Sequence, residues 1–316
     1  MKEITRKEFL KSIGALGAGA ALAGFGCSKK TDENPTPVEV RNPDSIDLAV
    51  VKGPDPKVIT RRAVLTLGGM SMFVNRGDDV VIKPNICISG SGYEMAATTN
   101  PEVVGEIVKL CFEAGAGKVR VMDRPFDGEP ADAYVSSGIK EEVEASGGEM
   151  EVMSLIMFKE YEIPDALDLD SCKIYEGFMD ADVIINVPIA KHHSLAGLTL
   201  GCKNLLGTTL VPSAFHRNMG DRVSDLVSLI RPDLTIVDAV RILTKNGPRG
   251  GRLDYVDKLD TVIVSADIVA ADSYATSFFG KTGNDISYIH TAASRGIGVM
   301  DLSRLNIKEI DLFASA

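Results

Sequence analysis

Three consecutive segments decide the fold: DVVIKP at residues 79–84, NPEVVGEIVKLCFEAGAG at 100–117 and KVRVMD at 118–123. The first and the third are short apolar runs, and Pro84 ends the first of them. Runs of this length, bounded by turn residues, are typical of buried strands. We therefore expect one strand over 79–83 and a second over 119–122.

The segment between these two strands carries the signals of a helix. Asn100 is a favoured N-terminal capping residue, Pro101 suits the first helical position, and Gly115 suits the position after the last turn. The apolar residues in between fall on one helical stripe, which consists of Val103, Val104, Ile107, Val108 and Cys111. The whole stretch from 79 to 122 therefore predicts a β-α-β unit.

Similar alternation continues on both sides of this unit. It predicts an α/β protein with a mostly parallel sheet built from βα units and helices on both faces. The other expected strands are 47–51, 149–155, 182–188, 234–237, 261–264 and 307–313. The other expected helices are 56–70, 221–230, 267–279 and 285–294.

Residues 1–27 have the composition of an export signal. A basic start, TRKEFLK at 5–11, precedes an uncharged Gly/Ala-rich stretch over 12–26, which is too short for a membrane span. The segment resembles a twin-arginine signal in which Lys7 replaces the second arginine, so the general secretory route stays open. A buried amphipathic helix is the structural alternative.

Cys27 follows this segment at the place where a lipoprotein carries its acylated cysteine. Gly24 stands where an aliphatic residue would be expected in such a signal. Acylation of Cys27 would put the protein in the periplasm or on a membrane, either the outer side of the cytoplasmic membrane or the outer membrane. We expect no other contact with a membrane.

The rest of the chain divides into a linker and a folded region. Residues 28–45 are polar, contain proline and lack any period, as linkers do. Residues 46–316 are expected to form the α/β domain, with about 46–180 and 181–316 as two candidate lobes. About 270 residues are enough for a full hydrophobic core.

The charge and the cysteine content of the chain limit the kinds of molecule and cofactor that it is expected to bind. The formal net charge is −10, and removal of residues 1–26 takes away four basic and two acidic residues, which leaves −12. A chain with this much negative charge repels the phosphate backbone of nucleic acids. We therefore expect no nucleic-acid binding. The cysteines beyond Cys27 form no C-x-x-C pair, so the chain has no iron–sulfur motif. Their even number permits disulfides, although Cys111 is expected in the core.

The end of the first strand predicts an anion site. Lys83 and Asn85 stand at the carboxyl end of the strand, where ligands bind in open parallel sheets. The following SGSG at 89–92 and the helix that begins after Asn100 offer backbone N–H groups. The structural alternative is that Lys83 is solvated and the glycines only turn the chain.

A second polar group follows the strand expected at 182–188. It contains Lys191, His192 and His193, and then Lys203 and Asn204. Adjacent residues of an extended segment point to opposite sides, so one of the two histidines would enter a site while the other faces water. A histidine here would move protons or bind a metal. A capping or surface pair of histidines is the alternative.

Acidic residues follow several strands as well. Asp123 ends the strand 119–122 and Asp238 follows the run Leu-Thr-Ile-Val, so each is a candidate partner of the histidine or of a metal. A structural role of Asp238 is an equal alternative. Asp267 is expected to cap a helix. Asp272 lies inside that helix and needs another explanation.

The ordered set of these segments resembles the family known as domain of unknown function 362, over about residues 48–280. The matching segments are VIKPN at 81–85, TTNPEVV at 98–104, EAGAGKV at 113–119, Asp123, DVIINVP at 182–188, Lys191, His193, LTLGCKNLLG at 198–207, DLTIVD at 233–238, Gly247-Pro248 and Asp272. The family pattern has Lys, one spacer and His, which makes His193 the aligned histidine. Many relatives carry a Cys-rich ferredoxin-like domain, which this chain lacks. The resemblance implies an exported α/β protein with a shared polar site and supplies no reaction.

The first functional hypothesis is an enzyme that acts on a small anionic substrate, a carboxylate or a phosphate. Lys83, Lys191 and Lys203 would hold the anion, and Asn85 and Asn204 would orient it. His193 would move protons, with Asp238 or Asp123 orienting it. A divalent metal would take its ligands from His193, Asp123 and Asp272.

The second hypothesis is a membrane-tethered protein that binds an anion or a metal ion through the same residues without catalysis. One observation separates the two hypotheses. A histidine and a carboxylate that converge at the lysines favour the enzyme, and lysines without such a partner favour binding alone. A redox accessory protein ranks third, because the sequence has neither a G-x-G-x-x-G segment nor a cysteine cluster.

Overall fold

The computed structural model describes residues 45–314, and ten strands within this range form one sheet. From Ile46 onward the described residues belong to one compact unit. The export signal, Cys27 and nearly all of the expected linker lie outside the described residues, so those expectations stay predictions. The mixed α/β class with a mostly parallel central sheet is confirmed.

The main run of strands has the order β12-β1-β11-β10-β7-β2-β3-β4, and β8 extends the sheet by pairing with β10 and β9. A separate hairpin contains β5 and β6. The strands are β1 Leu48–Lys52, β2 Asp79–Pro84, β3 Lys118–Val121, β4 Glu149–Met150, β5 Phe158–Glu162, β6 Ser171–Tyr175, β7 Val183–Val187, β8 Ile189–His193, β9 Gly197–Thr199, β10 Leu234–Leu243, β11 Val256–Ser265 and β12 Ile307–Asp311.

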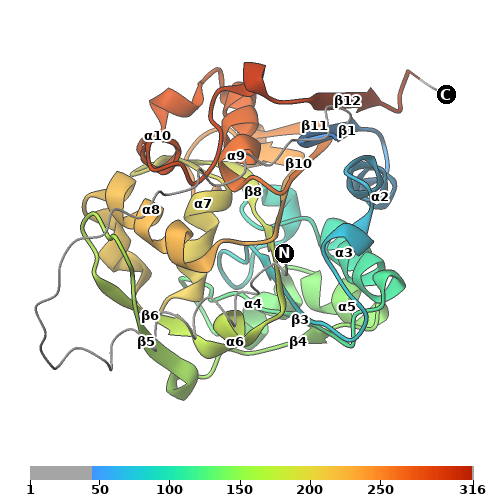
Figure 1. Ribbon diagram of the computed structural model, residues 1–316. Helices are drawn as coiled ribbons and strands as arrows, with labels where there is room; N and C mark the ends of the chain where they lie inside the picture. The colour runs from blue at the N-terminus through green and yellow to red at the C-terminus, as the bar shows by residue number, and fades with distance from the viewer. Residues whose placement is uncertain (1–44, 315–316) are drawn as a thin grey trace, which may run out of the picture. The chain divides into compact units, whose positions relative to one another are not determined.

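Most of the helices form two groups, which lie on the right and on the left of Figure 1, and α4 and α6 lie below them. On the right are α2, α3 and α5, and on the left are α7, α8, α9 and α10. The helices are α2 Pro56–Thr66, α3 Pro101–Ala114, α4 Pro130–Ser136, α5 Ile139–Ala145, α6 Glu176–Asp180, α7 Gly201–Asn204, α8 Met219–Ile230, α9 Ile268–Thr276 and α10 Ser287–Ser294.

The β2-α3-β3 unit confirms the prediction made from residues 79–122. Asn100 caps α3 by accepting a hydrogen bond from the Glu102 N–H at 2.9 Å, and Pro101 is the first helical residue. Gly115 ends the helix with φ of 105°, a left-handed conformation that favours glycine. β2 and β3 pair in parallel, as a β-α-β connection through a crossover helix requires.

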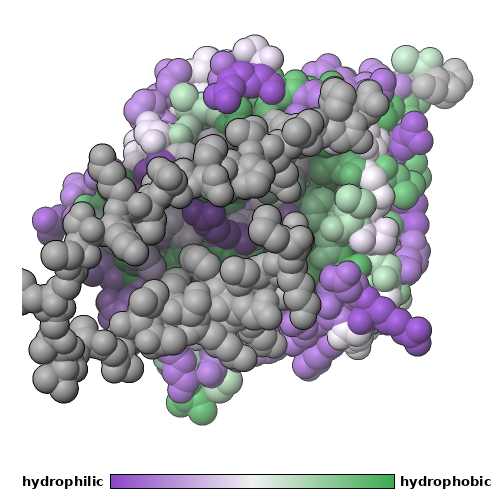
Figure 2. All heavy atoms as spheres, in the orientation of Figure 1, coloured by the Kyte–Doolittle hydropathy of each residue, from purple (hydrophilic) through white to green (hydrophobic). Residues whose placement is uncertain are grey.

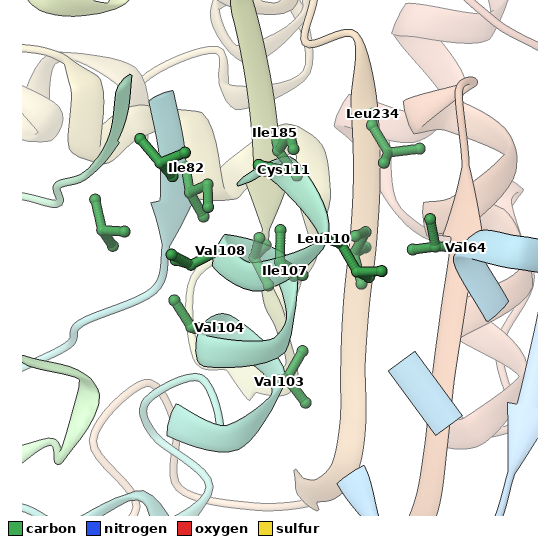
Figure 3. Close-up of a cluster of buried hydrophobic side chains, with 14 of the residues drawn as sticks. Val64, Ile82, Val103, Val104, Ile107, Val108, Leu110, Cys111, Ile185 and Leu234 are labelled. Carbon is green, nitrogen blue, oxygen red and sulfur yellow. The ribbon is translucent and has the colours of Figure 1, made fainter. Parts of the chain in front are cut away.

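Alternation along the strands gives the sheet two covered faces. On one face, Ile82 of β2, Ile185 of β7 and Leu234 of β10 pack in the cluster around α3 (Figure 3). The alternate residues of β2 and β7 point the other way, and Lys83 and Asn186 are register partners among them. That second face is covered by α7 and α9. The pleat of the sheet therefore places Lys83 in the layer that contains α7.

Three sequence expectations differ from the structure. The strand expected over 149–155 is only Glu149–Met150, because the apolar residues that follow are largely exposed and form a 3₁₀ turn at Leu155–Met157. β10 and β11 are ten residues each, and β11 runs antiparallel to both β1 and β10. The hairpins β5-β6 and β8-β9 were not expected, because alternation there is weak.

The surface view in Figure 2 is hydrophilic over much of its rim, and hydrophobic residues gather on its right over α2 and α3. Val58 and Leu65 of α2 are about half exposed. No helix within residues 45–314 is both long and apolar enough to cross a bilayer.

Candidate functional site

A cavity of about 520 Å³ opens on the side of the sheet that carries α7. Its lining comes from β2 and the loop after it, from the loop after β3, from β8, β9 and the turn between them, from α7 and the segment between α7 and α8, and from the loop after β10. The residues that line it are Lys83, Asn85, Ile86, Cys87, Asp123, Arg124, Pro125, Phe126, Lys191, His193, Ser194, Leu195, Thr199, Lys203, Asn204, Leu206, Gly207, Pro212, Ser213, His216 and Pro248.

Lys83 is buried at the floor of this cavity and is neutralised by a carboxylate. Its Nζ lies 2.8 Å from Oδ1 of Asp123 and donates to Oδ1 of Asn204 at 2.9 Å. The other oxygen of Asp123 accepts the N–H of Ile86 at 2.6 Å. Burial lowers the pKa of Lys83, and the neighbouring carboxylate acts in the opposite direction. The pair therefore adds little net charge to the cavity.

Asn204 joins α7 to the sheet beneath the cavity. Its Nδ2 donates to Oδ1 of Asn186 at 2.8 Å and to the carbonyl oxygen of Lys83 at 3.2 Å. Its Oδ1 accepts from Nδ2 of Asn85 at 2.8 Å as well as from Lys83. Asn186 in turn donates to the carbonyl oxygen of Gly201 at 3.0 Å. The amides of Asn85 and Asn204 thus hold the lysines and the backbone in place.

Lys191 is a buried cation with neutral partners. Its Nζ donates to Oδ1 of Asn85 at 2.9 Å and to the carbonyl oxygen of Ala97 at 2.5 Å. No carboxylate among residues 45–314 lies within ion-pair distance of it. Its positive charge is therefore not balanced by the described part of the protein.

Lys203 is the lysine of the cavity that lacks a fixed partner. It is 8% exposed, and its side-chain amine makes no hydrogen bond or ion pair with any residue in the described range. Burial and then the charge of Lys191 lower the pKa of Lys203 to about 8; Cys87 acts in the opposite direction, and Lys83 adds the smallest effect. The amine is therefore partly neutral just above physiological pH.

His193 is a neutral imidazole whose tautomer is set by the backbone. Its Nδ1 accepts the N–H groups of Leu195 at 3.2 Å and Ala196 at 3.3 Å, so the ring proton belongs on Nε2. Burial and the charge of Lys203 lower the pKa of His193 to about 3. The ring lies 6.1 Å from that of His216 at the exposed rim.

His192 points away from the cavity, as alternation along an extended segment requires. Its Nδ1 accepts the N–H of Gly247 at 3.1 Å, which holds the loop containing Pro248 against the site. The carbonyl oxygen of Pro248 lies 3.5 Å from Sγ of Cys87. The two histidines therefore act on opposite sides of β8.

Residues 80–277 match the family described as Domain of unknown function (DUF362), and this range contains the whole lining of the cavity. The match covers more than half of the chain. The chain belongs to the DUF362 family. A thylakoid-associated protein from Synechocystis sp. is a relative, 31% identical over 222 residues. The alignment covers 66% of this chain and 65% of that relative, which is less than two thirds of its length.

Two solved structures resemble this DUF362 chain at 12% identity. One is the lactate racemase apoprotein from Thermoanaerobacterium thermosaccharolyticum, with a TM-score of 0.44 over 74% of this chain and 57% of that chain. The other is a protein from Thermotoga maritima, with a TM-score of 0.37 over 72% of this chain and 60% of that chain.

Two acidic residues of the DUF362 pattern lie outside the lining. Asp238 is buried and accepts the N–H groups of Asn100 at 2.7 Å and Val240 at 2.9 Å. Asp272 is buried in α9 and accepts those of Gly201 at 2.6 Å and Cys202 at 2.8 Å, at the start of α7. Burial raises the pKa of Asp238 to about 6 and that of Asp272 to about 7.

The structure therefore brings together most of the residues singled out in the sequence. Seven of them line one cavity: Lys83, Asn85, Asp123, Lys191, His193, Lys203 and Asn204. Asp267 caps α9 as expected. Sequence reasoning missed Cys87 and His216 as lining residues. Cys87 lies two residues after Asn85 in the same strand-end loop, and this spacing was the available signal.

The expected metal ligands are engaged by other groups. Nδ1 of His193 and both oxygens of Asp123 and of Asp272 have the partners described above. In the described part of the chain, no group of three or more His, Cys, Asp or Glu side chains is arranged to hold a metal ion. Cys87, Cys111, Cys172 and Cys202 are buried free thiols, and Cys111 packs in the core as expected.

Proposed function

We propose that the cavity binds a small organic anion, a carboxylate or a phosphate, and that this DUF362 protein is an enzyme that acts on it. One observation carries the proposal. Lys191 and Lys203 are buried in the wall of one cavity, and neither has a carboxylate partner in residues 45–314. Buried charges without a partner are costly, so an anion that enters this cavity gains strong interactions.

The remaining lining residues would position the anion. Lys191 is fixed by Asn85 and Ala97, so its charge occupies a defined place before the ligand arrives. The neutral imidazole of His193 would donate from Nε2 to an oxygen of the substrate. A neutral histidine in this role stabilises an oxygen on which negative charge develops.

Asp238 would act through Lys191 rather than on the substrate. Its carboxylate holds the N–H of Asn100, three residues after Ala97, whose carbonyl oxygen accepts from Lys191. We therefore assign Asp238 a positioning role and keep the direct contacts with substrate for Lys191, Lys203 and His193.

Thermal unfolding with a panel of anions tests this proposal. Acetate, succinate, benzoate and phosphate would be compared with chloride at constant ionic strength. At least one is expected to raise the unfolding temperature of the wild type, and Lys191→Met should abolish this shift. Lys118→Met is the matched control, because that lysine is half exposed on β3. A shift that survives in Lys191→Met contradicts the proposal.

The second candidate function is binding without catalysis, and one observation favours it. No carboxylate in the described range hydrogen-bonds to His193, so the imidazole lacks the usual orienting partner of a general base. Turnover of a bound anion, followed by mass spectrometry of the small molecules, separates the two functions. A ligand recovered unchanged after long incubation supports binding alone.

We also propose that the protein is exported and anchored through Cys27. The composition of residues 1–27 supports this, and the relative named as thylakoid-associated is consistent with a place at a membrane. Cys27→Ser should move the protein from the membrane fraction to the soluble fraction and abolish labelling with a fatty acid. Membrane association that persists in this variant argues against the anchor.

A divalent metal bound through His193, Asp123 or Asp272 stays a proposal with a simple test. Elemental analysis of protein purified without chelators would show near-stoichiometric metal. A metal-free sample that binds the anion normally would remove the metal from the site.

A further inference from the structure

Among the three buried lysines of the cavity, Lys203 has a distinct environment. Lys83 is bound by Asp123 and Asn204, and Lys191 is bound by Asn85 and Ala97. Lys203 is also buried, at 8% exposure against 1% for the other two, yet within residues 45–314 no hydrogen-bond acceptor or carboxylate holds its amine. An amine that lines a cavity without a fixed partner is available to react with what enters.

The backbone around Lys203 is held firmly although its amine is not. The N–H groups of Gly201 and Cys202 donate to the carboxylate of Asp272, and the carbonyl oxygen of Gly201 accepts from Asn186. The next residue, Asn204, is bonded to Asn186 and to Lys83. Lys203 therefore stands between two anchored residues on one turn of helix, which is the rigid support that a reactive group requires.

The electrostatics of the cavity favour the neutral form of this amine. Burial of the side chain, followed by the positive charge of Lys191 and a smaller effect of Lys83, lowers the pKa of Lys203 to about 8. At pH 7 about one amine in ten is then unprotonated. A lysine desolvated beside other cations is a recognised form of activated nucleophile toward carbonyl groups.

We propose that Lys203 is a nucleophile that forms an imine with the carbonyl group of an oxo carboxylate. The proposal rests on the anion-binding function above and names its substrate class. Lys191 would bind the carboxylate, and the ketone or aldehyde of the same molecule would reach Lys203. Apolar lining at Leu206, Pro212 and Pro248 leaves room for an apolar remainder, because about 520 Å³ exceeds what a three-carbon acid fills.

The step balances without a redox partner. The neutral amine of Lys203 attacks the carbonyl carbon, a C–N bond forms, and the π electrons of the carbonyl move to oxygen. His193 would donate a hydrogen bond from Nε2 to this oxygen. The nitrogen then gives up its two protons, and the oxygen leaves with them as water. The product is a covalent imine, which withdraws electrons from the neighbouring carbons of the substrate.

Reductive trapping on the full chain tests the proposal. Pyruvate, phenylpyruvate and levulinate, which vary the spacing of the two groups and the apolar remainder, would each be incubated with the protein and sodium borohydride. Intact-mass and peptide mass spectrometry should show one reduced adduct on Lys203 for at least one acid. Adducts spread over exposed lysines such as Lys118, with none on Lys203, overturn the proposal.

Two variants separate the covalent step from anion binding. Lys203→Arg keeps the charge and lacks a nucleophilic amine, so it should lose the adduct and keep an anion-induced thermal shift. Cys87→Ser, a change in the same wall, should keep the adduct. If Lys203→Arg fails to fold, the site of the adduct in the wild type decides the matter alone. Anion binding with no adduct refutes the imine and leaves the proposed function standing, whereas no binding and no adduct refutes both.

Discussion

The Nζ of Lys83 lies 2.8 Å from Oδ1 of Asp123, and both side chains are almost fully buried. The pair is formed by the ends of the neighbouring parallel strands β2 and β3. A parallel sheet brings the carboxyl ends of its strands to one edge, so residues 40 positions apart in sequence meet there. The pair thus links the β-α-β unit to the floor of the cavity.

Removing one partner of this pair should be costly. Asp123→Ala leaves a buried ammonium without its anion and an Ile86 N–H without its acceptor, so we expect a loss of about 3–5 kcal/mol in the free energy of unfolding. Urea denaturation measures it. In the double variant with Lys83→Met the loss should be smaller, because no uncompensated charge remains.

The exposed pair of Lys118 and Glu149 is the matched control. These side chains lie 3.4 Å apart and are more than half exposed. Glu149→Ala should cost less than about 1 kcal/mol. Equal losses at the two pairs would contradict the account of the buried one.

Gly207 is the position that gives the pair its space. A Cβ at this residue would lie 2.7 Å from Nζ of Lys83 and closer still to Oδ1 of Asp123. Gly207→Ala should therefore destabilise the protein by about 1–3 kcal/mol and weaken anion binding, as measured by urea denaturation and calorimetry. In Gly92→Ala the three atoms nearest to the new methyl group belong to the flexible side chain of Glu94, so this control should remain stable.

The fold could be predicted where local signals agreed with tertiary packing. Asn100, Pro101 and Gly115 occupy the positions in α3 that their conformational preferences favour. The prediction of a strand over 149–155 was wrong for the opposite reason. Its apolar residues satisfied a strand pattern, but Val152 and Leu155 are exposed, and a pattern carries no information on whether a neighbouring element covers it.

The sequence was enough to predict which residues belong to the site, but it predicted less well which of them contact one another. Strand ends converge in any parallel sheet, so Lys83 and Lys191 could be placed together in advance. Which lysine forms an ion pair depends on distances between side chains, and these distances are fixed only by the packing of the helices against the sheet. Asp123 reaches Lys83, and no carboxylate of the described range reaches Lys203. Asp272 and Asp238 likewise do not line the cavity. Their carboxylates accept hydrogen bonds from backbone N–H groups, and the sequence does not reveal these contacts.

Asp272 should control the position of Lys203. Asp272→Ala removes the acceptor of the Gly201 and Cys202 N–H groups, so the start of α7 loses its anchor. We expect a lower unfolding temperature and also a lower affinity for the anion, measured by calorimetry under conditions in which the variant is folded. A variant that is less stable but binds with wild-type affinity would show that the anchor does not position Lys203.

Asp267→Ala provides the comparison on the same helix. Asp267 accepts the N–H groups of Val269 and Ala270 and that of Val299, whereas Asp272 accepts those of Gly201 and Cys202 at the start of α7. This variant should also lose stability, by about 1–2 kcal/mol for a helix cap. Its affinity for the anion should stay unchanged, which separates loss of stability from loss of position.

The affinity for the anion should depend on pH through Lys203. The groups that act on its amine are Lys83, Lys191, Cys87 and His193. Because the pKa of Lys203 is lowered to about 8, its charge is present below this pH and lost above it. Affinity should therefore fall as the pH rises through about 8. Calorimetric titrations from pH 5 to 9.5 measure it.

Two features make this pH profile specific. His193 has a pKa of about 3, so its own titration contributes no change between pH 5 and 9.5. In Lys203→Arg the guanidinium stays charged throughout, so the fall near pH 8 should disappear. A fall that persists in this variant would assign the titration to another group. Trapping by borohydride should follow the opposite course, rising up to about pH 8 and then levelling, because the neutral amine is the form that reacts.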